Sequence, residues 1–318
     1  MHLQTINPIG LGIDAGGTST RWALASADGS IITEGQVAGL SALQMNSEGG
    51  REALRSTLAQ LADDVRAAGE PAYVCAGMTG FDQGSEAGYG IVSMLAGVIG
   101  VGREAIRLGN DVEIAYLDIF ALGAGYVVYA GTGSIAAFID EEGEMHRAGG
   151  RGNLLDDGGG GYWIAREALR QIWRAEDEHP DSWRDSPMAV EMFARIGGSD
   201  WAASRDFIYG GSSRGDIGKL AIAVAAAART DPVALAILQA AGVELARLGH
   251  AMIARFGARP IALAGRAIEL HPAIEQSCRA HLPVDTDIKV VVSQAHYAAA
   301  RIAARTAANS CGQKSSEI

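Results

Sequence analysis

Hydrophobic and polar residues alternate along the chain in two ways. Residues 9–14 and 125–131 are short apolar runs that end in glycine-rich loops, a pattern typical of buried strands. Residues 49–68 instead repeat an apolar residue every three or four positions, which predicts an amphipathic helix. Strand patterns and helix patterns take turns along most of the sequence. We therefore expect an α/β protein.

One order of elements occurs twice. The first forty residues read as a strand, a Gly/Thr/Ser loop at residues 14–20 (DAGGTST), a second strand, the turn Asp28-Gly29 and a third strand. After Gly125 the same order returns, with the loop YAGTGS at residues 129–134 and another acidic-glycine turn. The sequence therefore predicts an internal duplication of the structural plan.

The chain length supports the same division. At roughly 150 residues per domain, 318 residues correspond to two domains. We place the N-terminal domain at residues 1–118 and the C-terminal domain at residues 119–293, with a cleft between them. A closing helix at about residues 294–308 is expected to pack back on the first domain.

Several helix ends are marked by capping residues. Asp231 with Pro232 predicts the start of a long helix and Gly257 its end. Earlier in the chain, Asp216 is expected to be the N-cap of the helix that follows it. The glycine-rich stretch at residues 148–169 contains apolar residues that a linker would lack. It predicts a buried, sharply folded loop that lines the cleft.

Composition narrows the class of protein. The net charge of −11 argues against nucleic-acid binding, which needs a basic surface. The three cysteines have no paired spacing, so we expect neither disulfides nor a zinc or cluster site. The N-terminus lacks the regions of a signal peptide, and no uncharged apolar run approaches the ~20 residues of a membrane span. These features predict a cytoplasmic protein without a membrane partner.

The two glycine loops suggest phosphate binding. Glycine-rich turns expose backbone N–H groups to a ligand, although either loop alone could be a plain hairpin turn. Two matched loops could hold the β- and γ-phosphates of ATP. Asp14 at the entrance of the first loop would repel phosphate unless a cation intervened, so it predicts Mg²⁺ held through water and favours ATP over NAD.

Two further acidic sites fit a kinase. Asp111 follows the apolar residues 106–109 and could serve as general base for an attacking hydroxyl, or it could cap a helix together with Asn110. Asp156 and Asp157 are adjacent and are expected to point to different sides. One could reach a ligand hydroxyl while the other caps a helix. Trp163 and Trp173 are interpreted as core residues.

With these motifs in place, the chain resembles the N-acetylglucosamine kinase branch of the BadF/BadG/BcrA/BcrD ATPase family, within the sugar kinase, Hsp70 and actin superfamily. The similarity runs from about residue 10 to residue 305. GIDAGGTST resembles the first phosphate motif, and NDVEIAYLDIFALGAGYVVYAGTGS resembles the catalytic aspartate region and the second phosphate motif. GGRGNLLDDGGGGYWI is similar to the family's GGWGxLLGDEGSGYWI.

The resemblance implies a duplicated ribonuclease-H-like, or actin-like ATPase, fold. It also implies ATP and Mg²⁺ as cofactors, transfer to the 6-hydroxyl of N-acetylglucosamine or glucosamine, and a homodimer. Asp111 would be catalytic, and Asp14 would bind the metal. The expected phosphate-binding residues are Gly16, Gly17, Thr18, Ser19, Gly131, Thr132, Gly133 and Ser134. The expected adenosine-binding residues are Ala264 and Gly265. The expected sugar-binding residues are Ser41, Thr79, Asn110, Asp111, Thr132, Gly150, Arg151 and Asp157.

The chain departs from the family pattern around the sugar. Leu43 stands where the acetylglucosamine kinases have Asn, and Arg151 replaces the Trp of GGWG, as in glucosamine kinases. Gly158 and Gly160 replace the Glu and Ser of DEGSG. Arg151 could contact the acceptor, or it could pair with Asp156 or Asp157. These changes leave open whether the acceptor is N-acetylglucosamine, glucosamine, N-acetylmuramic acid or N-acetylmannosamine.

Three other functions are considered. An activator ATPase of the same family needs cysteines that bridge a cluster between subunits, and kinases of the ROK group carry a zinc motif rich in Cys and His. The chain has neither pattern. A non-catalytic ATP-binding sensor is compatible with the altered DDGGGG loop, but the presence of Asp111 argues against it.

Overall fold

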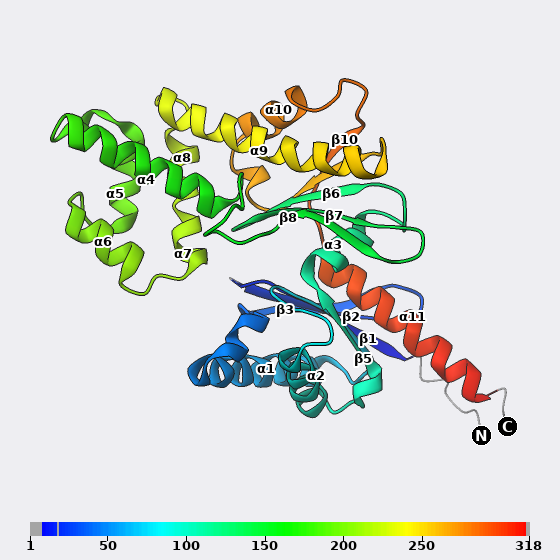
Figure 1. Ribbon diagram of the computed structural model, residues 1–318. Helices are drawn as coiled ribbons and strands as arrows, with labels where there is room; N and C mark the ends of the chain where they lie inside the picture. Colours follow the sequence, from blue (N-terminus) through cyan, green and yellow to red (C-terminus); the bar gives the residue numbers. More distant parts are fainter. Residues whose placement is uncertain (1–7, 18, 316–318) are drawn as a thin grey trace. The chain divides into compact units, whose positions relative to one another are not determined.

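A computed structural model describes residues 8–17 and 19–315. The chain divides into two compact units, residues 1–118 together with 293–318, and residues 119–292. Each unit is built around one five-stranded sheet (Figure 1). Thr18, expected to bind phosphate, lies outside the described residues.

The sheet of the first unit has the order β3-β2-β1-β4-β5. Its strands are β1 Ile9–Ala15, β2 Ser19–Ala25, β3 Ile31–Ala38, β4 Pro71–Met78 and β5 Ile106–Asn110. Strand β2 is antiparallel to both of its neighbours, β1 and β3, whereas β1, β4 and β5 are parallel. The C-terminal ends of β1, β4 and β5 therefore meet at one edge of this sheet.

Helices cover both faces of this sheet. They are α1 Glu48–Ala68, α2 Glu86–Ile99, α3 Asp111–Ile119 and α11 Ala295–Ser315, with short 3₁₀ helices η1 Ala42–Asn46 and η2 Arg103–Ala105. Leu11 and Ile13 of β1 join α1 and α2 in a hydrophobic core. Alternate residues of a strand point to opposite faces, so Gly10 and Gly12 face α11 on the other side. The predicted closing helix is longer than expected, because it continues to Ser315.

The sheet of the second unit has the order β10-β9-β6-β7-β8, which repeats the order of the first sheet when it is read from β8 to β10. Its strands are β6 Tyr126–Ala130, β7 Ser134–Ile139, β8 Met145–Gly149, β9 Ile261–Ala264 and β10 Ile288–Val291. Strands β6, β7 and β8 are antiparallel, and β6, β9 and β10 are parallel. The arrangement matches that of the first unit strand for strand, so the predicted duplication of plan is confirmed.

Helices α4 to α8 follow β8 in the chain and stand apart from the second sheet (Figure 1). The helices of this unit are α4 Gly161–Glu178, η3 Ser182–Asp185, α5 Pro187–Ile196, α6 Trp201–Tyr209, α7 Arg214–Lys219, α8 Ala221–Ala227, α9 Pro232–Phe256, η4 Ile268–Leu270 and α10 Pro272–Ala280. Helix α4 packs against α5, α7 and α8, while α9 packs against the sheet and α10.

The helix ends confirm one sequence prediction and correct another. Asp231 caps α9, with Pro232 in its first turn and Gly257 at its end, as predicted. Asp216 is not an N-cap. Ser213 caps α7 instead, and Asp216 is the third helical residue, completing a capping box with Ser213. Both residue types favour a helix start, so local sequence alone did not separate them.

Helix α9 is long and apolar enough to cross a membrane by length and composition alone. In this structure it packs against strands β6, β7 and β8 and against α10. Its buried residues include Leu238, Leu245 and Met252. These contacts make α9 a core helix of the second unit.

Candidate active site

The loop between β1 and β2 turns its carbonyl groups toward the protein. The carbonyl of Ala15 accepts a hydrogen bond from the Thr79 N–H (2.9 Å), and that of Gly16 accepts one from the Leu40 N–H (3.1 Å). The Gly16 N–H donates to the Ser19 carbonyl, while the Gly17 N–H has no protein acceptor among the described residues. Gly17 is exposed. The Gly17 N–H group is therefore available to a ligand.

The loop between β6 and β7 follows the same rule. The carbonyls of Gly131 and Thr132 accept hydrogen bonds from the first N–H groups of α4, at Gly161 (2.8 Å) and Tyr162 (2.9 Å). The Gly133 carbonyl accepts one from the Gly131 N–H. Within the described part of the chain, the N–H groups of Thr132 and Gly133 donate to no protein acceptor. Free N–H groups on a glycine loop are suited to an anion.

Close packing holds this second loop in place. A Cβ atom on Gly160 would lie 2.6 Å from the carbonyl carbon of Gly133, so only glycine fits at residue 160 without a shift. The Ser134 hydroxyl is buried and donates to the Gly158 carbonyl at 2.6 Å. Its side chain therefore supports the loop. Phosphate binding by the predicted loop residues stays a prediction.

Asp111 begins α3 directly after β5, at the edge where the parallel strands end. The Asn110 side chain accepts a hydrogen bond from the Val112 N–H at 2.9 Å, and the Asp111 side chain accepts one from the same N–H at 3.0 Å. Asn110 thus already performs the capping that was considered for Asp111. The carboxylate of Asp111 is not needed as the only cap of this helix.

The surroundings of Asp111 make its carboxyl group a weak acid. Burial raises its pKa to about 6, and the negative charge of Asp14 acts in the same direction. A hydrogen bond from the Thr79 side chain and the Val112 N–H oppose the shift. A carboxylate with a pKa near neutrality is suited to accept a proton from a hydroxyl and to release it again.

Asp14 lies opposite Arg21 in the register of β1 and β2, and the two side chains form an ion pair. The Arg21 Nη2 atom donates to Asp14 Oδ2 at 3.1 Å. One oxygen of the predicted metal-binding carboxylate is therefore committed to an arginine. Among the described residues, no three His, Cys, Asp or Glu side chains gather as a metal site.

Ser41 and Thr79 lie together in the first unit. The Ser41 hydroxyl donates to the Thr79 carbonyl at 3.2 Å and caps η1. Leu43, the departure from the family's Asn, is 62% exposed, and its side chain lies 3.0 Å from where a Cβ on Gly80 would be. Thr79 thus links Ser41 and Leu43 to the carboxylate of Asp111.

The glycine-rich loop before α4 places its two aspartates differently. Asp157 is 3% exposed and has a positive φ of 58°, which is uncommon outside glycine. Its Oδ1 atom accepts a hydrogen bond from the Gly152 N–H at 3.1 Å. Burial raises its pKa, and the charge of Arg214 opposes this. Asp156 instead pairs with Arg247 of α9 at 3.0 Å.

The loop is only partly buried, which corrects the sequence prediction. Residues 157–161 are buried, but Leu154 and Leu155 are 91% and 81% exposed. Gly150 and Arg151 precede them. Arg151 is exposed and forms no ion pair within the described residues, while Asp156 and Asp157 are paired with other arginines. The ion pair that we considered between Arg151 and these aspartates is therefore not formed.

The family's Glu is absent at Gly158, and a different acid lies close by. A Cβ atom on Gly158 would lie 2.7 Å from the Oε2 atom of Glu244, which α9 provides. Glu244 in turn pairs with Arg247. The α9 side chains thus occupy the space that a larger residue at 158 would need.

Gly265 follows β9 with a φ of +99°, and a Cβ there would lie 2.4 Å from the Ala130 carbonyl oxygen. This position requires glycine for a structural reason, because the chain turns tightly over the end of β6. Ala264 is buried at the end of β9. Their contact with adenosine stays a prediction.

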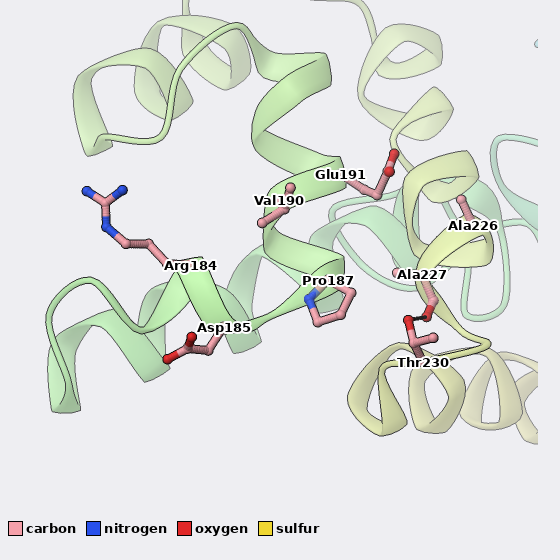
Figure 2. Close-up of a pocket in the computed structure, with 8 residues that line it drawn as sticks. All are labelled: Arg184, Asp185, Pro187, Val190, Glu191, Ala226, Ala227 and Thr230. Carbon is pink, nitrogen blue, oxygen red and sulfur yellow. Dashed lines mark hydrogen bonds between the residues drawn. The ribbon is translucent and has the colours of Figure 1, made fainter.

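Trp173 forms part of a helical core, as predicted. Its ring packs on Phe193 and, edge to face, on Trp201. Trp163 is half-buried in α4. A cavity of about 360 Å³ lies in the same helical region, lined by residues of η3, α5 and α8 and by Thr230 (Figure 2). None of the predicted site residues lines it, so this cavity is not the candidate active site.

Sequence reasoning missed two charged residues next to the predicted site. Arg21 pairs with Asp14, and Arg214 lies beside Asp157 and Gly133. The residue spacing between Arg21 and Asp14, on neighbouring strands of a predicted hairpin, could have suggested the first pair. Arg214 lies 57 residues beyond Asp157 in a helical region, and no local pattern connects them.

Two units with one strand order, each with a glycine loop after its first strand, define a duplicated ribonuclease-H-like fold of the actin-like ATPase class. Residues 11–278 match the BadF/BadG/BcrA/BcrD ATPase family, and the chain belongs to that family. The predicted fold class and family are confirmed.

Individual relatives are more distant. Over 173 residues the chain is 27% identical to the N-acetylmuramic acid/N-acetylglucosamine kinase of Clostridium acetobutylicum, covering 53% of this chain and 54% of that protein. Over 183 residues it is 29% identical to the N-acetyl-D-glucosamine kinase of Dictyostelium discoideum, covering 53% and 55%. The matched stretch thus spans about half the length of these curated relatives.

A solved structure from Chromobacterium violaceum, described as a candidate N-acetylglucosamine kinase, resembles the whole chain. The TM-score is 0.70 at 24% identity, and the similarity covers 95% of this chain and 99% of that one. At this identity the likeness shows the fold.

Proposed function

We propose that the chain is an ATP-dependent kinase that phosphorylates the 6-hydroxyl of an amino sugar, N-acetylglucosamine or glucosamine. The observation that carries the proposal is the Asp111 carboxylate, which has a pKa of about 6 and a hydrogen bond from Thr79 at the sheet edge. The family and the names of the two relatives support a sugar as acceptor and ATP as donor.

In this proposal the residues have distinct tasks. The loops around Gly17 and Gly133 donate N–H groups to phosphate oxygens of ATP. Asp111 orients the sugar hydroxyl and takes its proton as the bond from the sugar oxygen to the γ-phosphorus forms. The bond from that phosphorus to the oxygen of ADP breaks at the same time. Asp157 accepts a hydrogen bond from another sugar hydroxyl.

The role of Asp111 can be tested by replacing it with Asn. Asn keeps the size and the hydrogen bond from Val112, and Asn110 still caps the helix. Loss of the base should lower kcat by roughly 10²–10⁴-fold, with nucleotide affinity retained. Coupled ADP release measures kcat, and calorimetry measures affinity. A kcat within a few-fold of wild type, in a folded variant, would exclude Asp111 as the base.

We also propose that Mg²⁺ binds with the nucleotide near Asp14. Mg²⁺ usually keeps several waters and takes one or two carboxylates plus substrate phosphates, so a single free oxygen of Asp14 fits such a site. Bound Mg²⁺ would neutralise charge on the transferred phosphoryl group.

The Asp14→Ala variant should lose activity and the Mg²⁺ dependence of nucleotide binding. The matched control is Asp63→Ala, which removes an exposed acid of α1 in the same unit. Titration of a fluorescent ATP analogue with and without Mg²⁺ gives a readout that does not need turnover. Wild-type turnover by Asp14→Ala would remove the basis of the phosphate assignment.

The identity of the acceptor sugar can be tested directly. An ADP-release assay with N-acetylglucosamine, glucosamine, N-acetylmuramic acid and N-acetylmannosamine ranks the candidates directly. If none of the four stimulates ADP release, the sensor alternative is favoured over the kinase.

The remaining expectations concern the state of the protein in the cell. Cys75 and Cys278 are buried, and burial raises the pKa of each thiol to about 12, so neither is a reactive nucleophile. The cytoplasmic location stays a prediction. Homodimer formation stays a prediction, because the structure contains one chain.

A further inference from the structure

Arg214 lies at the second glycine loop, although it is distant in sequence. It is the first residue of α7. Its Nη1 atom is 3.7 Å from Oδ2 of Asp157. Its Nη2 atom is 3.3 Å from the point where a Cβ on Gly133 would be. Asp157 Oδ2 is closer still, at 2.3 Å from the same point, so the carboxylate adjoins the loop backbone and the guanidinium group lies beside both.

The donors of Arg214 are uncommitted. A guanidinium has five N–H donors, and 3.7 Å to Asp157 is an ion-pair distance that is too long for a hydrogen bond. Among residues 8–17 and 19–315, Arg214 donates no hydrogen bond, and its side chain is 43% exposed. Arg247, on the other side of the same aspartate pair, behaves differently, because it bonds to both Asp156 and Glu244.

The loop beside Arg214 has free donors as well. The N–H groups of Thr132 and Gly133 have no protein acceptor in the described chain, while the carbonyl groups of residues 131–133 are all bonded inward. The free donors of the Arg214 guanidinium group and the two free backbone N–H groups thus lie together at Gly133. Asp157 is the only carboxylate described as an ion-pair partner of Arg214; it also adjoins Gly133, and the arginine offsets its charge there. The combination favours an anionic ligand with several oxygens.

We propose that Arg214 binds the phosphoryl group that passes from ATP to the sugar. This inference rests on the proposed kinase function and adds a residue that contacts the transferred group. As the phosphorus leaves the oxygen of ADP and bonds to the sugar oxygen, Arg214 donates to its non-bridging oxygens, and no proton or electron leaves the arginine. The ion pair with Asp157 keeps the guanidinium over the loop.

The alternative is that Arg214 acts only through Asp157, by holding that carboxylate for the sugar. The two roles differ in which ligand loses affinity. A phosphoryl-binding arginine affects ATP more than ADP and lowers kcat at saturating sugar. A positioning arginine weakens sugar binding and leaves nucleotide binding and kcat at saturating sugar unchanged.

The test uses Arg214→Gln and Arg214→Lys in the full chain, with Arg205→Gln as control. Arg205 is an exposed arginine of α6 in the same unit that pairs with Asp206. Calorimetry gives the affinities for ADP, for a non-hydrolysable ATP analogue and for the sugar. ADP release gives kcat. Because Arg214 donates no hydrogen bond to protein, the Gln variant is expected to fold, and its circular dichroism and melting temperature verify this.

We expect Arg214→Gln to lower kcat by roughly 10²–10³-fold, the loss typical when one donor to a transition-state oxygen is removed. Affinity for the ATP analogue should fall while affinities for ADP and the sugar change less than about threefold. Arg214→Lys, which keeps the charge but not the fork, should lie between wild type and Gln. If the Gln variant is unstable, the Lys variant carries the same comparison.

Two outcomes would overturn the inference. Loss of sugar affinity alone would assign Arg214 to positioning Asp157, and wild-type values for every ligand would remove it from the site. Failure of the proposed function is distinguishable, because the wild type would then show no sugar-stimulated ADP release. The comparison of ATP analogue with ADP still tests Arg214 in that case.

Discussion

In the folded protein the Asp111 carboxyl group keeps its proton up to a higher pH than an aspartate in water does. Its pKa of about 6 arises from burial and from the neighbouring charge of Asp14. The unfolded chain releases this proton near the ordinary pKa of 3.8. Between these two values the folded state binds more protons, so the free energy of unfolding decreases as pH rises through the interval.

Asp111→Asn removes this titration and should therefore stabilise the protein at pH 7–8. The gain is at most roughly 3 kcal/mol, at 1.36 kcal/mol for each unit of pKa shift. It should disappear toward pH 3, where Asp111 is protonated in both states. Denaturant unfolding of wild type and variant across this pH range measures the difference. A difference that stays constant with pH would show that folding does not raise the pKa of Asp111.

Arg151 is available for a ligand because other arginines hold the nearby acids. Asp156 pairs with Arg247 and Asp157 with Arg214. Arg151→Trp should change the relative kcat/KM among the four sugars and leave the KM for ATP unchanged. Arg147→Trp is the matched control, since Arg147 is an exposed arginine of the neighbouring strand β8. An unchanged ranking of sugars would place Arg151 outside the acceptor pocket.

At this scale the sequence predicted some neighbours and missed others. Thr79 and Asp111 lie close together because each follows the end of a parallel strand, and the strand pattern predicted those ends. Ser41 joins them through its hydrogen bond to the Thr79 carbonyl. Arg214 could not be predicted in the same way. Its proximity to Asp157 depends on how α7 packs against α4, which no local pattern encodes.

At the scale of elements, the contact of α11 with β1 depends on two glycines. A Cβ atom on Gly12 would lie 2.1 Å from the backbone nitrogen of Ala300, and one on Gly10 would lie 2.0 Å from that of Ala304. The helix backbone therefore rests directly on the strand. Ala23, Ala25, Ala300 and Ala304 form the small-residue core at this contact.

Gly12→Ala should destabilise the protein by roughly 1–3 kcal/mol or more, because the backbone of α11 has to move away from the sheet. Gly97→Ala is the matched control. Gly97 lies inside α2 with nothing within 4 Å of its added Cβ, so alanine should be neutral or stabilise by up to ~1 kcal/mol. Chemical denaturation measures both. Equal effects of the two substitutions would contradict the close contact.

The elements also show where sequence patterns stop being informative. Period-two and apolar patterns predicted strands in both sheets, such as β1 and β6, because a strand buried on one or both faces needs them. Strand β10 was not among the predicted strands. The loop before α4 was expected to be buried on account of its leucines, yet Leu154 and Leu155 are exposed. A glycine-rich segment has no period, so an apolar residue within it does not reveal which side it faces.

At the scale of the whole molecule, the duplication explains why the chain contains two similar glycine loops. In each unit the loop joins the first two strands of a sheet with the same order, and in each a glycine carbonyl, at Gly16 and at Gly131, accepts a hydrogen bond from the protein backbone. The units differ in what was added. Only the second carries the helices α4 to α8, and two of these supply the Gly161 and Arg214 contacts to its loop.

Helix α11 has a consequence for how the protein is made. It covers β1, yet it comes from the far end of the chain, whereas residues 119–292 form the second unit without a break. A ribosome that works from the N-terminus therefore completes the first sheet early but cannot cover its glycine face until all of the second unit and then α11 have been synthesised. Throughout that interval the nascent chain exposes the surface of β1 that α11 later covers.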